Sequence, residues 1–110
     1  MDLAYQSLAR VSDLLSTGDT TSVELTEACL SRISSSEPQV NAFITISTDL
    51  AMQQATNADI AWQNWRNGKS QQKPSPLNGV PLAIKDVICV SDVVASAGSM
   101  MLKEFVPPYD

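Results

Sequence analysis

The ten residues Leu77–Asp86 are the stretch that most constrains the fold of this chain. They begin with an Asn-Gly pair, a strong turn signal, and continue with a short apolar run, Val80 to Ile84, of the kind that a buried strand shows. Lys85 ends that run. Burying an ammonium group costs free energy, because desolvation disfavours the charged form. Lys85 is therefore either the solvated end of a strand or a buried lysine whose neutral amine has a use.

The composition of the chain is that of a single domain. Its 110 residues, of which 44% are hydrophobic, suffice for one core. The net charge of −5 argues against a broad electrostatic contact with nucleic acid, which needs clustered lysines and arginines. The chain has no histidine and two cysteines, Cys29 and Cys89, without close spacing. We therefore expect no zinc site, and two buried free thiols rather than a disulfide.

The amino terminus lacks the pattern of a secretory signal, a basic stretch followed by an apolar one. No apolar run approaches the length that is needed to span a bilayer. From these two observations we expect the chain to be cytoplasmic and to make no contact with a membrane.

Hydrophobic periodicity predicts two helices before residue 38. The first covers Tyr5–Thr17 and ends at Gly18, a common residue at a helix end. The second begins at a capping box, in which Thr21 accepts a free backbone N–H group and Glu24 reaches back to the start of the helix. Pro38 is expected to stop this helix, because the residue before a proline avoids helical geometry.

A third helix is predicted to start at Ser47 or Thr48 and to end near Gly68. It carries a stripe of small and aromatic residues at helical spacing: Ala51, Ala55, Ala58, Trp62 and Trp65. A tryptophan pair on such a stripe marks either a partner surface or core packing. Core packing is the favoured interpretation, because tryptophan buries a large area.

Two segments predict strands. The first is Val40–Ser47, which is rich in β-branched and aromatic residues. The second is the apolar run before Lys85, to which a polar connector, residues 69–76, delivers the chain. After Lys85, residues 87–90 either prolong that strand or begin another, Ser91 and Asp92 indicate a turn, and residues 93–95 could form a short strand. A short helix is predicted over Met100–Phe105.

The sequence Leu-Asn-Gly-Val-Pro-Leu-Ala-Ile-Lys-Asp at 77–86 closely resembles the first motif of the amidase signature family. The likeness continues in the ending Phe-Val-Pro-Pro-Tyr-Asp at 105–110 and, upstream, in residues 22–26 and 40–44. It therefore covers nearly the whole chain. The ending is most similar to one branch of the family, the A subunits of glutamyl-tRNA(Gln) and aspartyl-tRNA(Asn) amidotransferases, which release ammonia from glutamine.

This resemblance implies an α/β fold, a mixed β-sheet covered by helices, of which the chain holds the amino-terminal helices and first strands. One amidase signature domain would contain a helical region with one strand (1–68), the connector (69–76) and the core strand with the lysine motif (77–110). In the family that lysine, here Lys85, is the catalytic base of a Ser–cis-Ser–Lys triad. The resemblance also implies partner subunits of the B and C types, with tRNA, ATP and Mg²⁺ bound by a partner and no cofactor bound by this chain.

Departures from the family pattern qualify this resemblance. Val87 stands where the family usually has asparagine, and Ala95 and Ser96 stand where threonines are common. The Gly/Ser-rich segment that supplies both serines and the oxyanion hole does not occur in these 110 residues. We therefore expect an amino-terminal piece of a longer enzyme that is inactive alone. The alternatives are an amidase of another branch that acts on small amides, and a non-catalytic interaction module that uses the Trp62 and Trp65 face.

Overall fold

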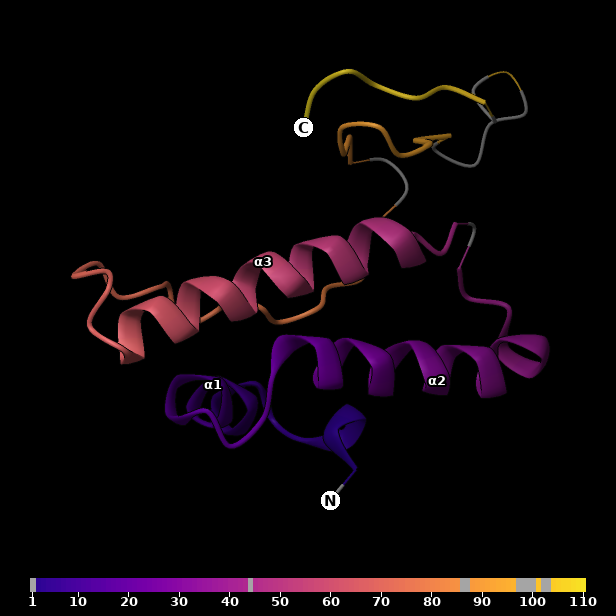
Figure 1. Ribbon diagram of the computed structural model, residues 1–110. Coiled ribbons are helices and arrows are strands. Elements are labelled where there is room, and N and C mark those ends of the chain that lie inside the picture. The colour runs from indigo at the N-terminus through magenta and orange to yellow at the C-terminus, as the bar shows by residue number, and fades with distance from the viewer. Residues whose placement is uncertain (1, 44, 86–87, 97–100, 102–103) are drawn as a thin grey trace. The chain divides into compact units, whose positions relative to one another are not determined.

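The computed structural model describes residues 2–43, 45–85, 88–96, 101 and 104–110. Its elements are a 3₁₀ helix η1 (Leu3–Tyr5) and the helices α1 (Leu8–Thr17), α2 (Ser22–Val40) and α3 (Thr48–Arg66), as Figure 1 shows. Contacts divide the chain into a helical unit, Met1–Asn41 with Thr48–Pro81, and a second unit, Ala42–Ser47 with Leu82–Asp110.

Helix α1 begins and ends at residues whose side chains or backbone favour a helix boundary. Ser7 Oγ accepts the N–H of Arg10 at 3.1 Å, which satisfies one free donor of the first turn. Gly18 ends the helix with φ 84°, a left-handed conformation that glycine adopts without steric cost. The predicted end of the first helix is confirmed. Its predicted start is not, because residues 3–5 form a separate 3₁₀ turn ahead of the Ser7 cap.

Helix α2 runs two residues beyond Pro38, so the prediction that this proline stops the helix is wrong. Pro38 lies in the last turn, where a proline removes one helical hydrogen bond. The helix ends instead at Asn41, which adopts a left-handed φ of 51° and donates its N–H to the carbonyl of Glu37 at 2.7 Å. Asparagine tolerates this conformation better than most residues.

The described residues of Val40–Ser47 do not form the predicted strand. Val40 belongs to α2, and residues 41–43 and 45–47 are irregular. Strands need hydrogen-bonded neighbours, and the one β-bridge among the described residues joins Val90 to Val93. In the part of the chain that the structure describes, the fold is therefore helical, and the sheet expected from the α/β prediction is not seen.

The core of the helical unit brings together all three α-helices. Its buried cluster consists of Val11, Leu15, Leu25 and Trp62, with Trp62 only 1% exposed. Within α3, Ala55 and Ala58 are also buried, and Trp65 packs edge-to-face on Trp62 with ring centroids 5.8 Å apart. The third predicted helix and its core-facing stripe are confirmed. Ala51 and Trp65, at the edges of the stripe, are half-buried.

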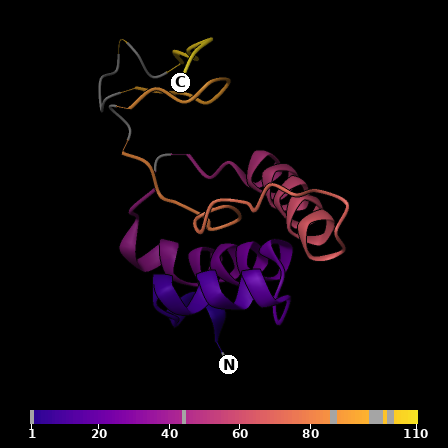
Figure 2. The same ribbon diagram turned by 90° about the vertical axis from the view of Figure 1, so that its left-hand side faces the viewer.

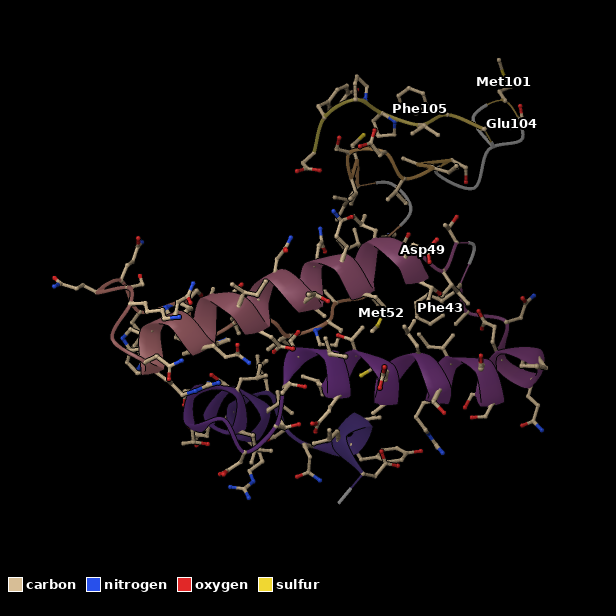
Figure 3. The ribbon with its side chains drawn as sticks, viewed as in Figure 1. Phe43, Asp49, Met52, Met101, Glu104 and Phe105 are labelled. Atoms are coloured by element: carbon tan, nitrogen blue, oxygen red, sulfur yellow. The ribbon has the colours of Figure 1, made fainter. Side chains whose placement is uncertain are left out.

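Charged side chains match the dipole of α3 at both ends. Asp49 lies in its first turn, as Figure 3 shows, and Arg66 lies in its last. These positions are favourable because a helix carries partial positive charge at its amino end and partial negative charge at its carboxyl end. Arg66 also donates from Nη1 to the carbonyl of Leu15 at 2.9 Å, and so satisfies a carbonyl near the end of α1.

Candidate functional site

The lysine motif begins with a tight turn at residues 77–80. The N–H of Val80 donates to the carbonyl of Leu77 at 3.1 Å, and Gly79, at the third position, has φ 94°. A positive φ at the third position alone is the signature of a type II turn, which favours glycine there. The turn predicted from the Asn-Gly pair is confirmed, and it lies within the helical unit.

This turn is packed directly on the helices. A Cβ added to Gly79 would lie 3.1 Å from Cβ and Oγ of Ser22 and 3.3 Å from Cβ of Ala58. The segment that contains it returns alongside α3 after that helix ends (Figures 1 and 2). Val80, the last residue of the turn, packs against the hydrophobic core. Glycine is therefore favoured at position 79 for two reasons, the positive φ of the backbone and the small space beside Ser22 and Ala58.

Lys85 lies in the second unit and is exposed. The segment 81–85 is irregular, so the prediction of a buried core strand at Val80–Ile84 is wrong for the structure described. Leu82 is 80% exposed and Ile84 is 52% exposed. An apolar run forms a buried strand only where other strands and helices cover it, and no described residue pairs with it as a strand. The Lys85 carbonyl accepts the N–H of Ile88 at 2.9 Å.

The second unit joins two further parts of the sequence. The N–H of Val93 donates to the carbonyl of Val90 at 3.1 Å across the predicted turn, in which Asp92 has φ 64°. The carboxyl-terminal motif lies against this turn, as the N–H of Asp92 donates to Pro107 and that of Ala95 to Phe105 (Figure 3 labels Phe105). Asp110 Oδ1 accepts the N–H of Ser91 at 2.6 Å. The turn at Ser91 and Asp92 is confirmed, and the Phe-Val-Pro-Pro-Tyr-Asp ending holds it.

Some predictions fall outside the described residues. Half of the short helix predicted over Met100–Phe105, residues 100, 102 and 103, lies outside the described residues. So do Asp86 and Val87, which directly follow Lys85. Both cysteines are free and half-buried. Cys29 packs against the core cluster, as predicted, and burial, followed by the negative charge of Asp2, raises the pKa of its thiol.

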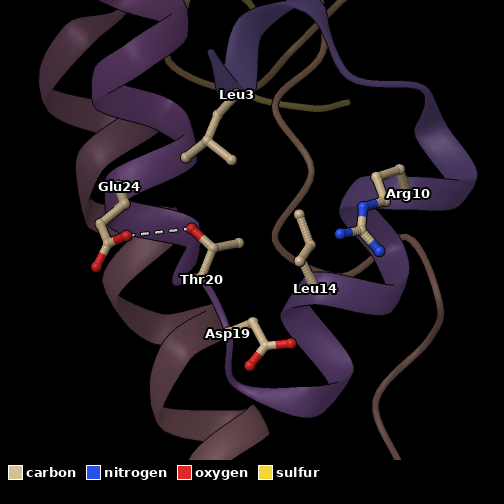
Figure 4. Close-up of a pocket in the computed structure, with 6 residues that line it drawn as sticks. All are labelled: Leu3, Arg10, Leu14, Asp19, Thr20 and Glu24. Carbon is tan, nitrogen blue, oxygen red and sulfur yellow. Dashed lines mark hydrogen bonds between the residues drawn. The ribbon is translucent and has the colours of Figure 1, made fainter. Parts of the chain in front are cut away.

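The helical unit also has a shallow pocket, shown in Figure 4. Leu3 and Leu14 form its apolar part, and charged Arg10, Asp19 and Glu24 lie around it. Glu24 accepts a hydrogen bond from the hydroxyl of Thr20 at 3.1 Å, rather than the backbone N–H expected of a capping box. The other half of that prediction is confirmed, because Thr21 Oγ1 accepts the N–H of Glu24. The residues that line the pocket do not include the lysine motif.

Sequence reasoning missed the residues that tie the helices to one another. Asp59 of α3 accepts the N–H groups of Ser22 and Val23 at 2.6 and 3.0 Å, and so caps α2 from outside. No local pattern signals this contact, since it joins residues 36 and 37 positions apart. The described residues contain neither a metal-binding group of three or more side chains nor a helix that could span a membrane.

Comparison with known proteins places these features in a family. The family model described as amidase matches residues 24–110. The A subunit of glutamyl-tRNA(Gln) amidotransferase from Chloroflexus aggregans is 43% identical over 109 residues, which are 99% of this chain and 21% of that protein. The proteins of the same name from Roseiflexus sp. and Marinomonas sp. are 43% and 40% identical over 111 and 105 residues. The chain thus spans about a fifth of the length of these relatives. No solved structure matches it significantly.

Proposed function

Since the chain belongs to the amidase family, we propose that Lys85 is the catalytic base of an amide-hydrolysing site whose serines are supplied from outside these 110 residues. The observation that carries the proposal is the family match, which includes the lysine motif within residues 24–110. The alignments with relatives cover 94–100% of this chain, which supports the family membership on which the proposal rests.

The chemistry follows from the triad that the resemblance implies. The neutral amine of Lys85 takes a proton from the middle serine, and that serine in turn activates the nucleophilic serine. The nucleophile attacks the amide carbon, an acyl-enzyme forms as ammonia leaves, and water then hydrolyses it through a second tetrahedral intermediate. A lysine side chain accepts a proton only in its neutral form, and burial of an amine disfavours the charged form.

Burial of Lys85 requires that the apolar segment around it be covered. In the second unit Leu82, Ile84 and Ile88 are 80%, 52% and 56% exposed, an arrangement that leaves large apolar side chains in water. We propose that in the complete enzyme this segment becomes a strand of a mixed β-sheet, which buries these side chains and shields the Lys85 amine from water at the same time.

The proposed substrate is glutamine. The relatives are named as A subunits of a glutamyl-tRNA(Gln) amidotransferase, so the ammonia would serve the transamidation of misacylated Glu-tRNA(Gln). Partner subunits of the B and C types would hold the tRNA and use ATP and Mg²⁺. The net charge of −5 fits this division, because an acidic chain is poorly suited to binding RNA directly.

The first test reads the coding DNA beyond codon 110. A frame that continues into a Gly/Ser-rich segment with two serines supports the proposal, and a stop codon after Asp110 contradicts it, because Lys85 would have no serine to serve.

The second test measures ammonia release from glutamine by the complete gene product with its partner subunits. Lys85→Ala is expected to lower turnover by about 10²–10⁴-fold, the usual contribution of a general base. Lys69→Ala is the matched control, because Lys69 is an exposed lysine of the connector. Near-normal turnover by Lys85→Ala would refute the assignment of the base. Turnover of simple amides but not of glutamine would refute the proposed substrate and favour another branch of the family.

A further inference from the structure

Each of the three α-helices donates one side-chain hydrogen bond to the backbone of residues 76–79. Ser12 Oγ of α1 donates to the carbonyl of Pro76 at 2.7 Å, and Ser22 Oγ of α2 donates to that of Gly79 at 2.6 Å. Trp62 Nε1 of α3 donates to the carbonyl of Asn78 at 2.9 Å. We call these three donors, Ser12, Ser22 and Trp62, the turn clasp.

Two of the three donors are shielded from water. Ser22 and Trp62 are each 1% exposed. A buried donor that loses its partner cannot replace it with water, so each of these bonds holds the turn more firmly than an exposed bond of the same length would. The close packing of Gly79 on Ser22 and Ala58 leaves the turn little room to shift.

The central donor of the clasp is itself fixed by α3. The carboxylate of Asp59 accepts the backbone N–H of Ser22 at 2.6 Å, and the hydroxyl of the same serine reaches Gly79. A continuous set of contacts therefore runs from α3 through the first residue of α2 to the turn. The first link of this set is a charge-assisted hydrogen bond, which is stronger than a bond between neutral groups.

Lys85 follows Gly79 by six positions. Six extended residues span at most about 20 Å, so fixing the turn fixes the end from which the lysine-bearing segment extends. A general base works only within hydrogen-bond reach of its partner, and a displacement of about 1 Å can cost about 10²-fold in rate. We propose that the turn clasp positions the segment that carries Lys85, so that Ser12, Ser22 and Trp62 are positioning residues for amide hydrolysis. This inference rests on the proposed function.

The test compares Ser22→Ala with Ser35→Ala in the complete gene product with its partner subunits. Ser35 also lies in α2 and donates its hydroxyl to a carbonyl, that of Arg32 at 3.1 Å, but this bond stays within the helix. For Ser22→Ala we expect kcat per folded enzyme to fall about 10-fold or more, while KM stays within about twofold of wild type. Ser35→Ala should leave both constants unchanged.

Amide hydrogen exchange reports the clasp independently of turnover. Ser22→Ala should speed exchange of the Asn78 and Val80 amides, which close the turn through Ser75 and Leu77, and should leave the buried helix amides around Leu15 protected. If Ser22→Ala does not fold, Trp62→Phe replaces it, because phenylalanine removes the Nε1 donor while it keeps one aromatic ring in the core.

The outcomes separate the clasp from the catalytic assignment. A folded Ser22→Ala enzyme with normal kcat, beside an inactive Lys85→Ala, overturns the clasp and leaves the proposed function intact. A fall in activity that matches the fraction of unfolded enzyme also overturns it, because the serine would then be only structural. Full activity of Lys85→Ala overturns both, and the exchange measurement then shows only whether the turn is held.

Discussion

Replacing Asp59 with alanine tests whether a side chain of α3 holds the first turn of α2. The leading N–H groups of a helix have no partners within the helix. In α2, Asp59 accepts the N–H of Ser22 at 2.6 Å and that of Val23 at 3.0 Å, while Thr21 Oγ1 accepts that of Glu24 at 3.1 Å. Asp59 therefore satisfies two of these three donors, from a different helix.

The cost of the substitution follows from what alanine leaves behind. Ser22 is 1% exposed, and a buried N–H group without a partner costs about 1–3 kcal/mol. Losing the negative charge at the start of a helix costs about 0.3–1 kcal/mol more. Since the half-buried Val23 also loses its acceptor, we expect the free energy of unfolding to fall by about 3 kcal/mol. Asp59→Asn keeps one acceptor oxygen and should cost about 1 kcal/mol.

A urea titration of the chain, followed by tryptophan fluorescence and circular dichroism, measures this difference. At a slope of about 1 kcal/mol per M, a loss of about 3 kcal/mol should lower the urea midpoint of Asp59→Ala by about 3 M. Asp59→Asn should unfold at a midpoint lower by about 1 M, for a slope of about 1 kcal/mol per M. Asp13→Ala, which removes the same charge from an exposed site of α1, is the control. An Asp59→Ala stability within about 0.5 kcal/mol of that control would refute the reasoning.

Two further predictions concern other parts of the helical unit. Gly79→Ala should destabilise the chain by about 1 kcal/mol more than Gly68→Ala, because both have positive φ but only Gly79 meets Ser22 and Ala58 at 3.1–3.3 Å, whereas Gly68 has nothing within 4 Å. Equal urea midpoints for the two variants would show that a Cβ at position 79 fits beside Ser22 and Ala58, and would refute this prediction. The raised pKa of Cys29 predicts slower alkylation by iodoacetamide at pH 8.5 in the folded chain than in urea. As pH rises, the thiol ionises in the unfolded chain before it ionises in the folded chain, so the free energy of unfolding should decline above about pH 8.5. Cys29→Ala should lack the part of this decline that is due to Cys29. If the pH profile is the same with and without Cys29→Ala, the prediction is contradicted.

The features that the sequence predicted correctly depend on residues close together in the chain. The end of α1 at Gly18 and the start of α2 at Thr21 were both predicted, because capping joins groups within one turn. Ser7, which caps the start of α1, was not identified. The core position of Trp62 follows from helical spacing alone, since one face of a helix must be buried. The Asn-Gly turn is likewise a local preference, for positive φ at Gly79.

By itself, then, the sequence determined where chain segments turn, which helix face is apolar, and, through the motif around Lys85, to which family the chain belongs. Tertiary structure alone decided that Asp59 caps α2 and that three helices bind the turn before the lysine, because those contacts join residues 16–64 positions apart. It also decided that the apolar run before Lys85 is irregular and mostly exposed instead of a buried strand. A helix satisfies its own backbone hydrogen bonds, whereas a strand depends on neighbours that its own residues do not specify.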